Sequence, residues 1–367
     1  MAPSIDTAIA TQASLLHAHF AETVLPLWRG PGFNAATELP YEALRTEDHT
    51  PLPVTRYRAM ACARQLFVFS LAGDAPHARR LFASLRRYFH DERHGGWFYS
   101  VDSAGAPLDR TKDLYTHAFI LFACAHYAAA CGERDARDIV NDTATLINAR
   151  FAATGGLLHA ALDEGFSAVQ SGPLQNPLMH LTEAYLAAYE TTGDAAFGHA
   201  LARLAQAVVS TFVHEPTGAI AELPIGTAGN RLEPGHQFEW FYLVARAGRT
   251  VDGSGLAAAL TRAFEFAQRH GVDPLTGGVC AALNEDGSVQ DTTQRIWAQT
   301  EYLRALATRG TQADLSALVP QIERFRARFL HTRGWYECKT AGGEIARADM
   351  PSTTPYHLAT AYASLPV

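Results

Sequence analysis

The sequence predicts an all-α fold, an (α/α)6 barrel of about twelve helices with short β-hairpins at one rim. Three observations support this prediction. A glycine-led segment recurs at intervals of about 60 residues, two helical patterns lie between most recurrences, and no linker or low-complexity stretch divides the chain. Six helical hairpins in succession would close into a toroid, so we expect residues 1–367 to form a single domain.

The glycine-led segments have the pattern of short β-hairpins. Each contains a short apolar or alternating run, and most continue through an Ala-Gly, Glu-Gly or Asp-Gly turn into a second run. The segments begin at Gly95, Gly155, Gly218, Gly277 and Gly334. Residues 30–53 lack this pattern, and we expect them to form a long loop over the rim.

Pairs of helical patterns fill the intervals between these segments. The clearest pair is HLTEAYLAAYE followed by AAFGHALARLAQAVV, with TTGD as the break between them. Apolar residues recur at helical spacing in both members, and their alanine-rich faces allow neighbouring helices to approach closely. This repetition predicts antiparallel helix pairs around the ring.

Composition and charge exclude several classes of protein. The net charge is −7 and no basic patch is present, which argues against a nucleic-acid partner. The first twenty residues lack the features of a targeting signal, and no apolar run looks long enough to span a bilayer. The five cysteines form no CxxC pair, as expected of free thiols. We therefore expect a cytoplasmic protein, monomeric or homodimeric, without a membrane partner.

Polar and aromatic side chains gather at the starts of the helices that follow the hairpins. If each hairpin leads into the next helix, these helices begin at the same end of the barrel and their first turns face one mouth. The set comprises Arg56, Arg58, Arg64, Lys112, Tyr115, His117, Asn176, His180, His236, Glu239, Arg295, Trp297, Gln299, Glu301 and His357. One histidine on an apolar helix is usually a core residue, but repetition at equivalent places indicates a pocket, and its lining suits a polyol.

Two other chemistries fit parts of this lining. His180 with Glu183, and His236 with Glu239, have an i, i+3 spacing that could ligate a metal, but the di-iron pattern places the glutamate first and needs further glutamates. Glu183, Glu239 or Glu301 could instead serve as the acid and base of an α/α glycosidase, although that reaction does not require the histidines. A non-catalytic sugar-binding protein is a third alternative.

Four motifs in the second half of the chain resemble the N-acylglucosamine 2-epimerase superfamily, which includes cellobiose 2-epimerase, D-mannose isomerase and sulfoquinovose isomerase. They are QNPLMHLTEAYLAAYE, EPGHQFEW, RIWAQTEYLRA and TTPYHLATAY, beginning at residues 175, 233, 295 and 353. The resemblance implies an (α/α)6 barrel that acts on the free reducing end of a sugar, with neither a metal nor a redox cofactor.

The resemblance also assigns roles to individual residues. His357 and His236 match the two catalytic histidines, and His180 matches a third that binds substrate. Arg64 matches the arginine that steadies the enediol oxygens, with Arg58 as the alternative. Asn176, Glu239, Trp297 and Gln299 fall on other pocket positions of the family, and Tyr115 from the helix starts and Glu183 from its spacing to His180 complete the expected substrate-binding set.

We expect a sugar aldose–ketose isomerase that interconverts D-mannose and D-fructose through an enediol(ate), with a sugar 2-epimerase of the N-acylglucosamine or cellobiose type as the alternative. Opening the sugar ring and moving the C2 proton both suit imidazole. His236 should stay neutral because a helix dipole disfavours its cation, and His357 should carry the proton between C2 and C1. The motif EPGHQFEWF resembles the isomerase branch more than the epimerase form GHDIEAS. In the tract before it, Arg231 only imperfectly replaces an arginine that sugar isomerases carry farther upstream.

Overall fold

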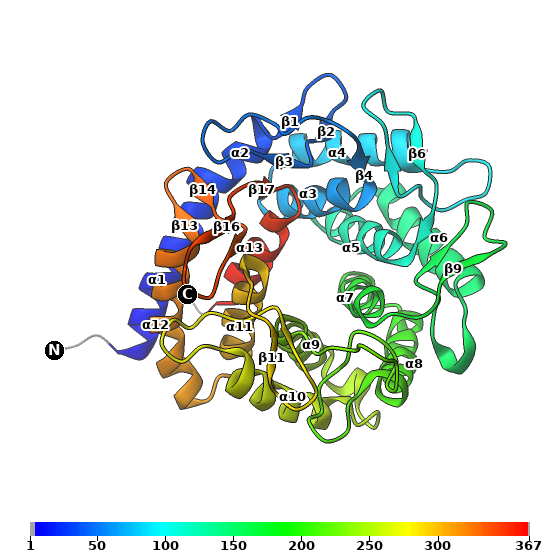
Figure 1. The fold of residues 1–367 in the computed structure, drawn as a ribbon. Helices are drawn as coiled ribbons and strands as arrows, with labels where there is room; N and C mark the ends of the chain where they lie inside the picture. The colour runs from blue at the N-terminus through cyan, green and yellow to red at the C-terminus, as the bar shows by residue number, and fades with distance from the viewer. Residues whose placement is uncertain (1–3, 366–367) are drawn as a thin grey trace.

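Twelve helices in six pairs form a toroid in which an outer ring surrounds an inner ring, within residues 4–365 that the computed structural model describes (Figure 1). The outer ring starts with one continuous helix made of α1 (Ile5–His19), the π-helical turn η1 (Phe20–Val24) and α2 (Leu25–Arg29). The other outer helices are α4 (Ala75–Phe89), α6 (Arg134–Arg150), α8 (Ala195–Phe212), α10 (Leu256–Gly271) and α12 (Gln312–Phe329). The inner helices are α3 (Ala59–Leu71), α5 (Leu114–Cys131), α7 (Gln175–Thr192), α9 (Pro234–Ala247), α11 (Ile296–Arg309) and α13 (Thr354–Ala363).

The inner helices form a closed ring. Each contacts the next, from α3 through α5, α7, α9 and α11 to α13, which contacts α3 again. Because they pack on both the outer ring and one another, inner helices are apolar around most of their circumference. One hydrophobic core follows the ring from Ile9 to Leu365. This arrangement confirms the predicted (α/α)6 barrel.

Helix α5 shows how strongly the inner ring is buried. By length and composition alone it could cross a membrane, although no run of that length was expected from the sequence, but 72% of it is buried inside the structure. In the toroid it packs against α3, α6 and α7. The Asp113 carboxylate caps its start by accepting from the Thr116 amide at 2.7 Å, and Gly132 ends it with a left-handed φ of 72°.

Four of the five predicted hairpins are present at the rim. They are β5–β6 (Ser100–Val101, Pro107–Asp109), β8–β9 (Ala161–Leu162, Val169–Ser171), β10–β11 (Ala282–Leu283, Val289–Asp291) and β15–β16 (Cys338–Lys339, Ile345–Arg347). In three of them the first strand also pairs with the strand that leads into an inner helix, namely β4 (Tyr57–Arg58), β7 (Lys112–Asp113) and β12 (Gln294–Arg295). This pairing holds the starts of α3, α5 and α11 at one rim.

The predicted hairpin after Gly218 is not formed. Ile220 makes one bridge to Val213, and the chain then continues to α9 without a strand. The Asn230 side chain bonds both the amide and the carbonyl of Leu223, so it satisfies backbone groups that a strand partner would otherwise satisfy. This loop supplies a side chain to the site described below.

Residues 30–53 are more ordered than the expected long loop. They contain the hairpin β1–β2 (Phe33–Asn34, Leu39–Pro40) and the strand β3 (Ala43–Leu44). β3 pairs with β17 (Met350–Pro351), just before α13, while β13 (Leu330–His331) and β14 (Gly334–Trp335) form a further hairpin after α12. The β3–β17 pair therefore joins the first unit of the ring to the last.

Candidate active site

A cavity of about 220 Å³ lies at the rim where the inner helices begin. Nine of the residues predicted from the sequence line it, from all six inner helices and the strand β12: Arg64, Tyr115, Asn176, His180, His236, Glu239, Arg295, Trp297 and His357. It continues outward into a vestibule of about 520 Å³, which Arg58, Tyr99, Arg231 and Arg295 help to line. The repeat therefore brings side chains from distant parts of the chain into one pocket.

Three of the predicted substrate-binding residues do not line the cavity. The Gln299 amide holds the rim backbone: its Oε1 accepts from the Val279 amide at 2.8 Å, and its Nε2 donates to the Val279 carbonyl at 3.0 Å. Glu183 lies deeper than the cavity, where its carboxylate accepts a hydrogen bond from His180 Nδ1. Arg58 lies in the vestibule and is paired with Glu42 at 2.6 Å.

Two other first-turn residues lie away from the mouth. The Lys112 ammonium is buried against the Asp91 carboxylate at 2.7 Å. His117 accepts from the Trp97 amide through Nε2, at 3.1 Å, and donates from Nδ1 to the Asp113 carbonyl at 2.8 Å. Both side chains thus fasten rim loops to the start of α5.

His236, the third residue of α9, is held by a carboxylate that the sequence did not reveal. Its Nδ1 donates to Glu222 Oε1 at 2.7 Å, and Glu233 Oε2 lies 3.6 Å away. Burial disfavours the imidazolium, but these two carboxylates outweigh burial and raise the pKa of His236 to about 9. The prediction of a neutral His236 is therefore wrong, because a helix dipole acts more weakly than two adjacent carboxylates.

Glu222 is itself fixed by the neighbouring inner helix. Gln175, the first residue of α7, donates from Nε2 to both Glu222 oxygens at 3.0 Å. The orientation of that amide is set by Trp240, whose Nε1 donates to Gln175 Oε1 at 2.8 Å. Glu222 comes from the segment GAIAELPIG, and the only sequence signal for it is that this segment departs from the hairpin pattern.

His357, the fourth residue of α13, has the opposite electrostatic environment. Its Nδ1 donates to Glu301 Oε1 at 3.0 Å, but burial and the nearby Arg64 guanidinium hold the pKa of His357 well below its usual range. The neutral ring therefore carries its lone pair on Nε2, which has no hydrogen-bond partner among residues 4–365. This atom is suited to act as a base.

The indole of Trp297 lies between the two histidines. Its ring is 5.0 Å from that of His236 and 5.6 Å from that of His357, with interplanar angles of 34° and 36°. The close approach of α9 and α11 depends on Gly235, because a Cβ there would come within 2.7 Å of the Trp297 ring. The indole thus fixes both imidazoles on one cavity wall.

Arg64, in the second turn of α3, lines the same cavity as the two histidines. Its Nη2 donates to the Tyr115 hydroxyl at 2.7 Å, and its guanidinium lies 4.1 Å from the centre of the Phe119 ring. No carboxylate within the described chain pairs with it, although it is almost fully buried. A fixed, uncompensated cation of this kind can stabilise negative charge that develops on a substrate.

Several polar atoms of the cavity have no partner in the described structure. Both carboxylate oxygens of Glu239 and the Oδ1 atom of Asn176 are buried without a hydrogen bond. Burial, with Glu301 and Glu183 nearby, raises the pKa of Glu239 well above its usual range. His180 also stays neutral, because burial lowers its pKa to about 4. Buried groups left unpaired in this way are suited to bind the hydroxyls of a sugar.

A layer of buried charges supports the cavity from beneath. Glu183 accepts from His180 Nδ1 at 3.3 Å and from the Tyr356 hydroxyl. Arg304 donates to Glu301 at 3.2 Å and lies 3.4 Å from the centre of the Tyr242 ring. Glu183 and Glu301 were predicted from the sequence, whereas Tyr242, Arg304 and Tyr356 were not, because none of them is among the motif positions and first-turn residues on which the prediction rested.

Three sets of side chains in the site could bring ligand atoms to a metal: His180, Glu183 and Glu239; Glu222, Glu233 and His236; and Glu239, Glu301 and His357. Most of these carboxylates already accept from a protein donor. Glu222 accepts from His236, and Glu301 accepts from His357 and Arg304. The arrangement is therefore better suited to proton transfer than to a cluster of free ligands.

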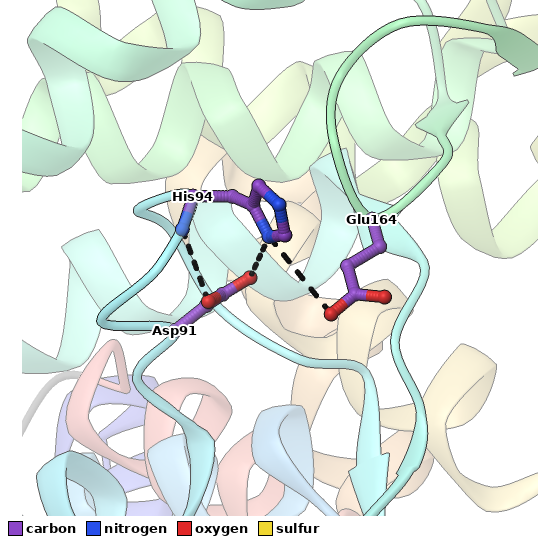
Figure 2. Close-up of side chains that lie close together, drawn as sticks. All are labelled: Asp91, His94 and Glu164. Atoms are coloured by element: carbon purple, nitrogen blue, oxygen red, sulfur yellow. Dashed lines mark hydrogen bonds and ion pairs between the residues drawn. The ribbon is translucent and has the colours of Figure 1, made fainter.

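A similar cluster lies outside the cavity, where Asp91 and His94 follow α4 and Glu164 comes from the β8–β9 hairpin (Figure 2). His94 Nδ1 is 3.2 Å from Asp91 and 3.9 Å from Glu164. Both carboxylates are already neutralised, Asp91 by the buried Lys112 ammonium and Glu164 by Arg110 at 2.7 Å. These contacts therefore join the loop that follows α4 to the β8–β9 hairpin.

Comparison with known proteins assigns the chain to a family. Residues 42–361 match the N-acylglucosamine 2-epimerase (GlcNAc 2-epimerase) family. The chain belongs to this family. It is 29% identical over 374 residues to a mannose-6-phosphate isomerase of Rhizobium meliloti (strain 1021), with 95% of both chains covered. It is 36% identical over 261 residues to a D-mannose isomerase of Thermobifida fusca, which covers 64% of this chain and 62% of that relative.

Solved structures of the family share the toroid. A cellobiose 2-epimerase from Spirochaeta thermophila DSM 6192 superposes with a TM-score of 0.85 at 22% identity, covering 99% of this chain and 98% of that one. A D-mannose isomerase also gives 0.85, at 19% identity over 99% of both chains. These likenesses support the fold, while membership of the N-acylglucosamine 2-epimerase family makes the chain a sugar isomerase or 2-epimerase.

Proposed function

We propose that this member of the family is an aldose–ketose isomerase that interconverts D-mannose and D-fructose. The observation that carries the proposal is the contrast between two histidines on one cavity: carboxylates surround His236 and favour its imidazolium, whereas Arg64 lies near His357 and favours the neutral ring. Paired titratable groups whose environments separate their pKa values are suited to act as acid and base. The names of the Rhizobium meliloti and Thermobifida fusca relatives are consistent with this choice.

The reaction begins with opening of the sugar ring. The His236 imidazolium donates a proton to the ring oxygen and regains one from the anomeric hydroxyl, so the ring opens without a net change in protonation. Glu222 holds the imidazolium ready through the 2.7 Å contact to Nδ1. The unpartnered oxygens of Glu239 and Asn176 bind hydroxyls of the open chain.

Proton transfer between the carbon atoms follows. His357 Nε2 removes the C2 proton, the electron pair forms the C1–C2 double bond, and negative charge develops on O1. The Arg64 guanidinium stabilises this enediolate. His236 protonates O1 and receives the proton of O2, and His357 then returns its proton to C1, which leaves the carbonyl at C2.

The asymmetry of the two histidines favours isomerisation over epimerisation. In an isomerase both histidines end the cycle with the protonation they started with, because His357 takes a proton from C2 and returns it to C1. A two-base epimerase would end each turnover with His236 neutral and His357 protonated. The environments of both residues oppose that state, so proton exchange with solvent would have to restore the starting protonation of both histidines after every cycle.

One assay tests the proposal against its alternatives. The purified protein, with no added nucleotide, is incubated with D-mannose in D2O before and after EDTA treatment, and products are followed by NMR. We expect D-fructose in both samples. Glucose as the main product would identify a 2-epimerase, and binding without turnover would identify a sugar-binding protein. Activity that is lost on chelation and restored by a divalent ion would contradict the metal-free mechanism, and release of reducing ends from an oligosaccharide would identify a glycosidase.

A further inference from the structure

We infer that the vestibule is a subsite for an anionic substituent at the end of the sugar remote from C1, such as a C6 phosphate ester, and that Arg295 is its main contact. The inference rests on the proposed isomerase function, because it assumes that the reducing end lies against His236 and His357. It adds a substrate class, phosphorylated aldoses, that the catalytic groups alone do not select.

The charges around the vestibule single out one arginine. Arg58 is neutralised by Glu42 at 2.6 Å, and Arg231 by Glu233 at 2.8 Å. Arg295 has neither an ion pair nor a side-chain hydrogen bond within the described part of the chain, although it lines both the vestibule and the catalytic cavity. A cation that remains uncompensated at the mouth of a cavity attracts anions into it.

Glu337, which lines the cavity, forms no ion pair with Arg295 within the described chain, and burial raises the pKa of its carboxyl although the Arg295 guanidinium opposes that shift. Glu337 is buried beside the cavity, where it accepts from the Thr354 hydroxyl at 2.7 Å and from Trp335 Nε1 at 3.3 Å. Asp113 and Glu222 also line the vestibule, but Asp113 caps α5 and Glu222 is paired with His236, so neither forms an ion pair with Arg295. The chain as a whole is acidic, with a net charge of −7. A general surplus of basic residues therefore does not account for the unpaired arginine.

The backbone of Arg295 is held in place. The residue belongs to β12, pairs with Cys338 and immediately precedes α11. Its guanidinium lies 5.5 Å from the centre of the Trp297 ring, the same ring that lies between the two histidines. Arg295 is therefore a solvent-exposed side chain at the junction of the cavity and the vestibule, next to the ring that both histidines contact.

The shape of the site determines which end of the sugar meets this arginine. C1 and C2 must reach His357 and Arg64 in the inner cavity of about 220 Å³. The far end of the chain, C6, then points into the vestibule of about 520 Å³, which has room for a substituent. A phosphate there would find a planar guanidinium able to bind it through two parallel hydrogen bonds.

The test compares kcat/KM for D-mannose 6-phosphate and D-mannose in the wild-type enzyme, in Arg295→Gln and in Arg137→Gln. Arg137 is an exposed arginine on the outer helix α6 and controls for the loss of one positive charge. We expect the wild type to prefer the phosphate ester by about tenfold or more, as one hydrogen-bonded charge contact allows. Arg295→Gln should lose most of this preference, chiefly through KM, whereas Arg137→Gln should keep it.

Each other outcome has a defined meaning. Equal efficiency on both sugars in the wild type, or an unchanged preference in Arg295→Gln, would overturn the subsite. A higher efficiency on cellobiose than on either hexose would show that the vestibule holds a neutral second sugar instead. If neither hexose is converted, the proposed function fails, and calorimetry then decides the subsite: D-mannose 6-phosphate must still bind the wild type more tightly than D-mannose and more tightly than it binds Arg295→Gln.

Discussion

His236 and His357 form nearly the same local contact, yet they adopt opposite charge states. Each is buried near the start of an inner helix and donates from Nδ1 to a glutamate, at 2.7 Å and 3.0 Å respectively. Among residues 4–365 the further donor to Glu222 is the uncharged Gln175, and Glu233 adds a second carboxylate near His236. Glu301, by contrast, also accepts from the Arg304 guanidinium, and the Arg64 cation lies close to His357.

The difference shows that a carboxylate partner does not by itself fix the charge of a buried histidine. What matters is the total charge that surrounds the ring, because burial always opposes the imidazolium. Around His236 the carboxylates outnumber the cations, and around His357 the cations offset the carboxylate. In the proposed mechanism, the charges around the two rings thus divide the histidines into an acid and a base.

The sharpest way to break the comparison is to remove each histidine in turn. His357→Asn should abolish both isomerisation and exchange of the C2 hydrogen with D2O, because the base itself is lost. His236→Asn should retain weak activity, because a fraction of any aldose opens unaided and general acid help is worth about 10²–10⁴-fold. Product NMR in D2O measures both reactions.

An epimerase would respond to these substitutions differently. Loss of either histidine would block inversion, but each variant could still exchange deuterium into C2 from its remaining face. Near-normal turnover in His357→Asn would show that the base has been assigned to the wrong residue.

Arg64→Lys should give the next largest effect, and it tests the cation that distinguishes the surroundings of His357. A lysine keeps the charge but cannot reproduce the planar donors that face Tyr115 and the cavity. We expect kcat to fall by about 10²-fold, more than KM rises, because the stabilisation belongs to the transition state. Arg58→Lys is the matched control, since Arg58 lies in the vestibule and is paired with Glu42. A change confined to KM would assign Arg64 to ground-state binding.

Much of this site follows from the sequence because the period of the repeat determines which helices begin at the same rim. That reasoning found nine side chains of the cavity. It failed for Gln299 because residues two apart on a helix point about 200° apart, so Gln299 cannot share the inward face of Trp297. A period of about 60 residues fixes where a helix starts, but it does not fix its rotation.

The charge state of His236 was unpredictable for another reason. Glu222 lies 14 residues upstream of it, in the one unit where the hairpin is missing, so no repeat relates the two positions. The contact also depends on Gln175 and Trp240, which come from two different inner helices. Local rules such as the helix dipole can be read from sequence, whereas a charge balance assembled from three segments cannot.

Glu222→Gln should give the smallest of the three effects, and it tests whether the charge balance divides the roles of the histidines. An amide of the same shape leaves burial in place and removes the main carboxylate, so the pKa of His236 should fall from about 9. His236 must be protonated to act as an acid, so wild-type kcat/KM should decline as the pH rises through about 9, and kcat/KM of the variant should decline at a lower pH.

The free energy of unfolding should depend on pH in the same direction. The raised pKa of His236 stabilises the fold fully below the unfolded pKa of about 6.5, and this contribution is lost as the pH rises through about 9. The pH profile of kcat/KM and thermal unfolding between pH 6 and 10 measure the two effects. Glu233→Gln is the control, and its shift should be smaller because Glu233 lies 3.6 Å from the ring. If kcat/KM of Glu222→Gln declines at the same alkaline pH as that of the wild type, another group, and not His236, supplies the acid.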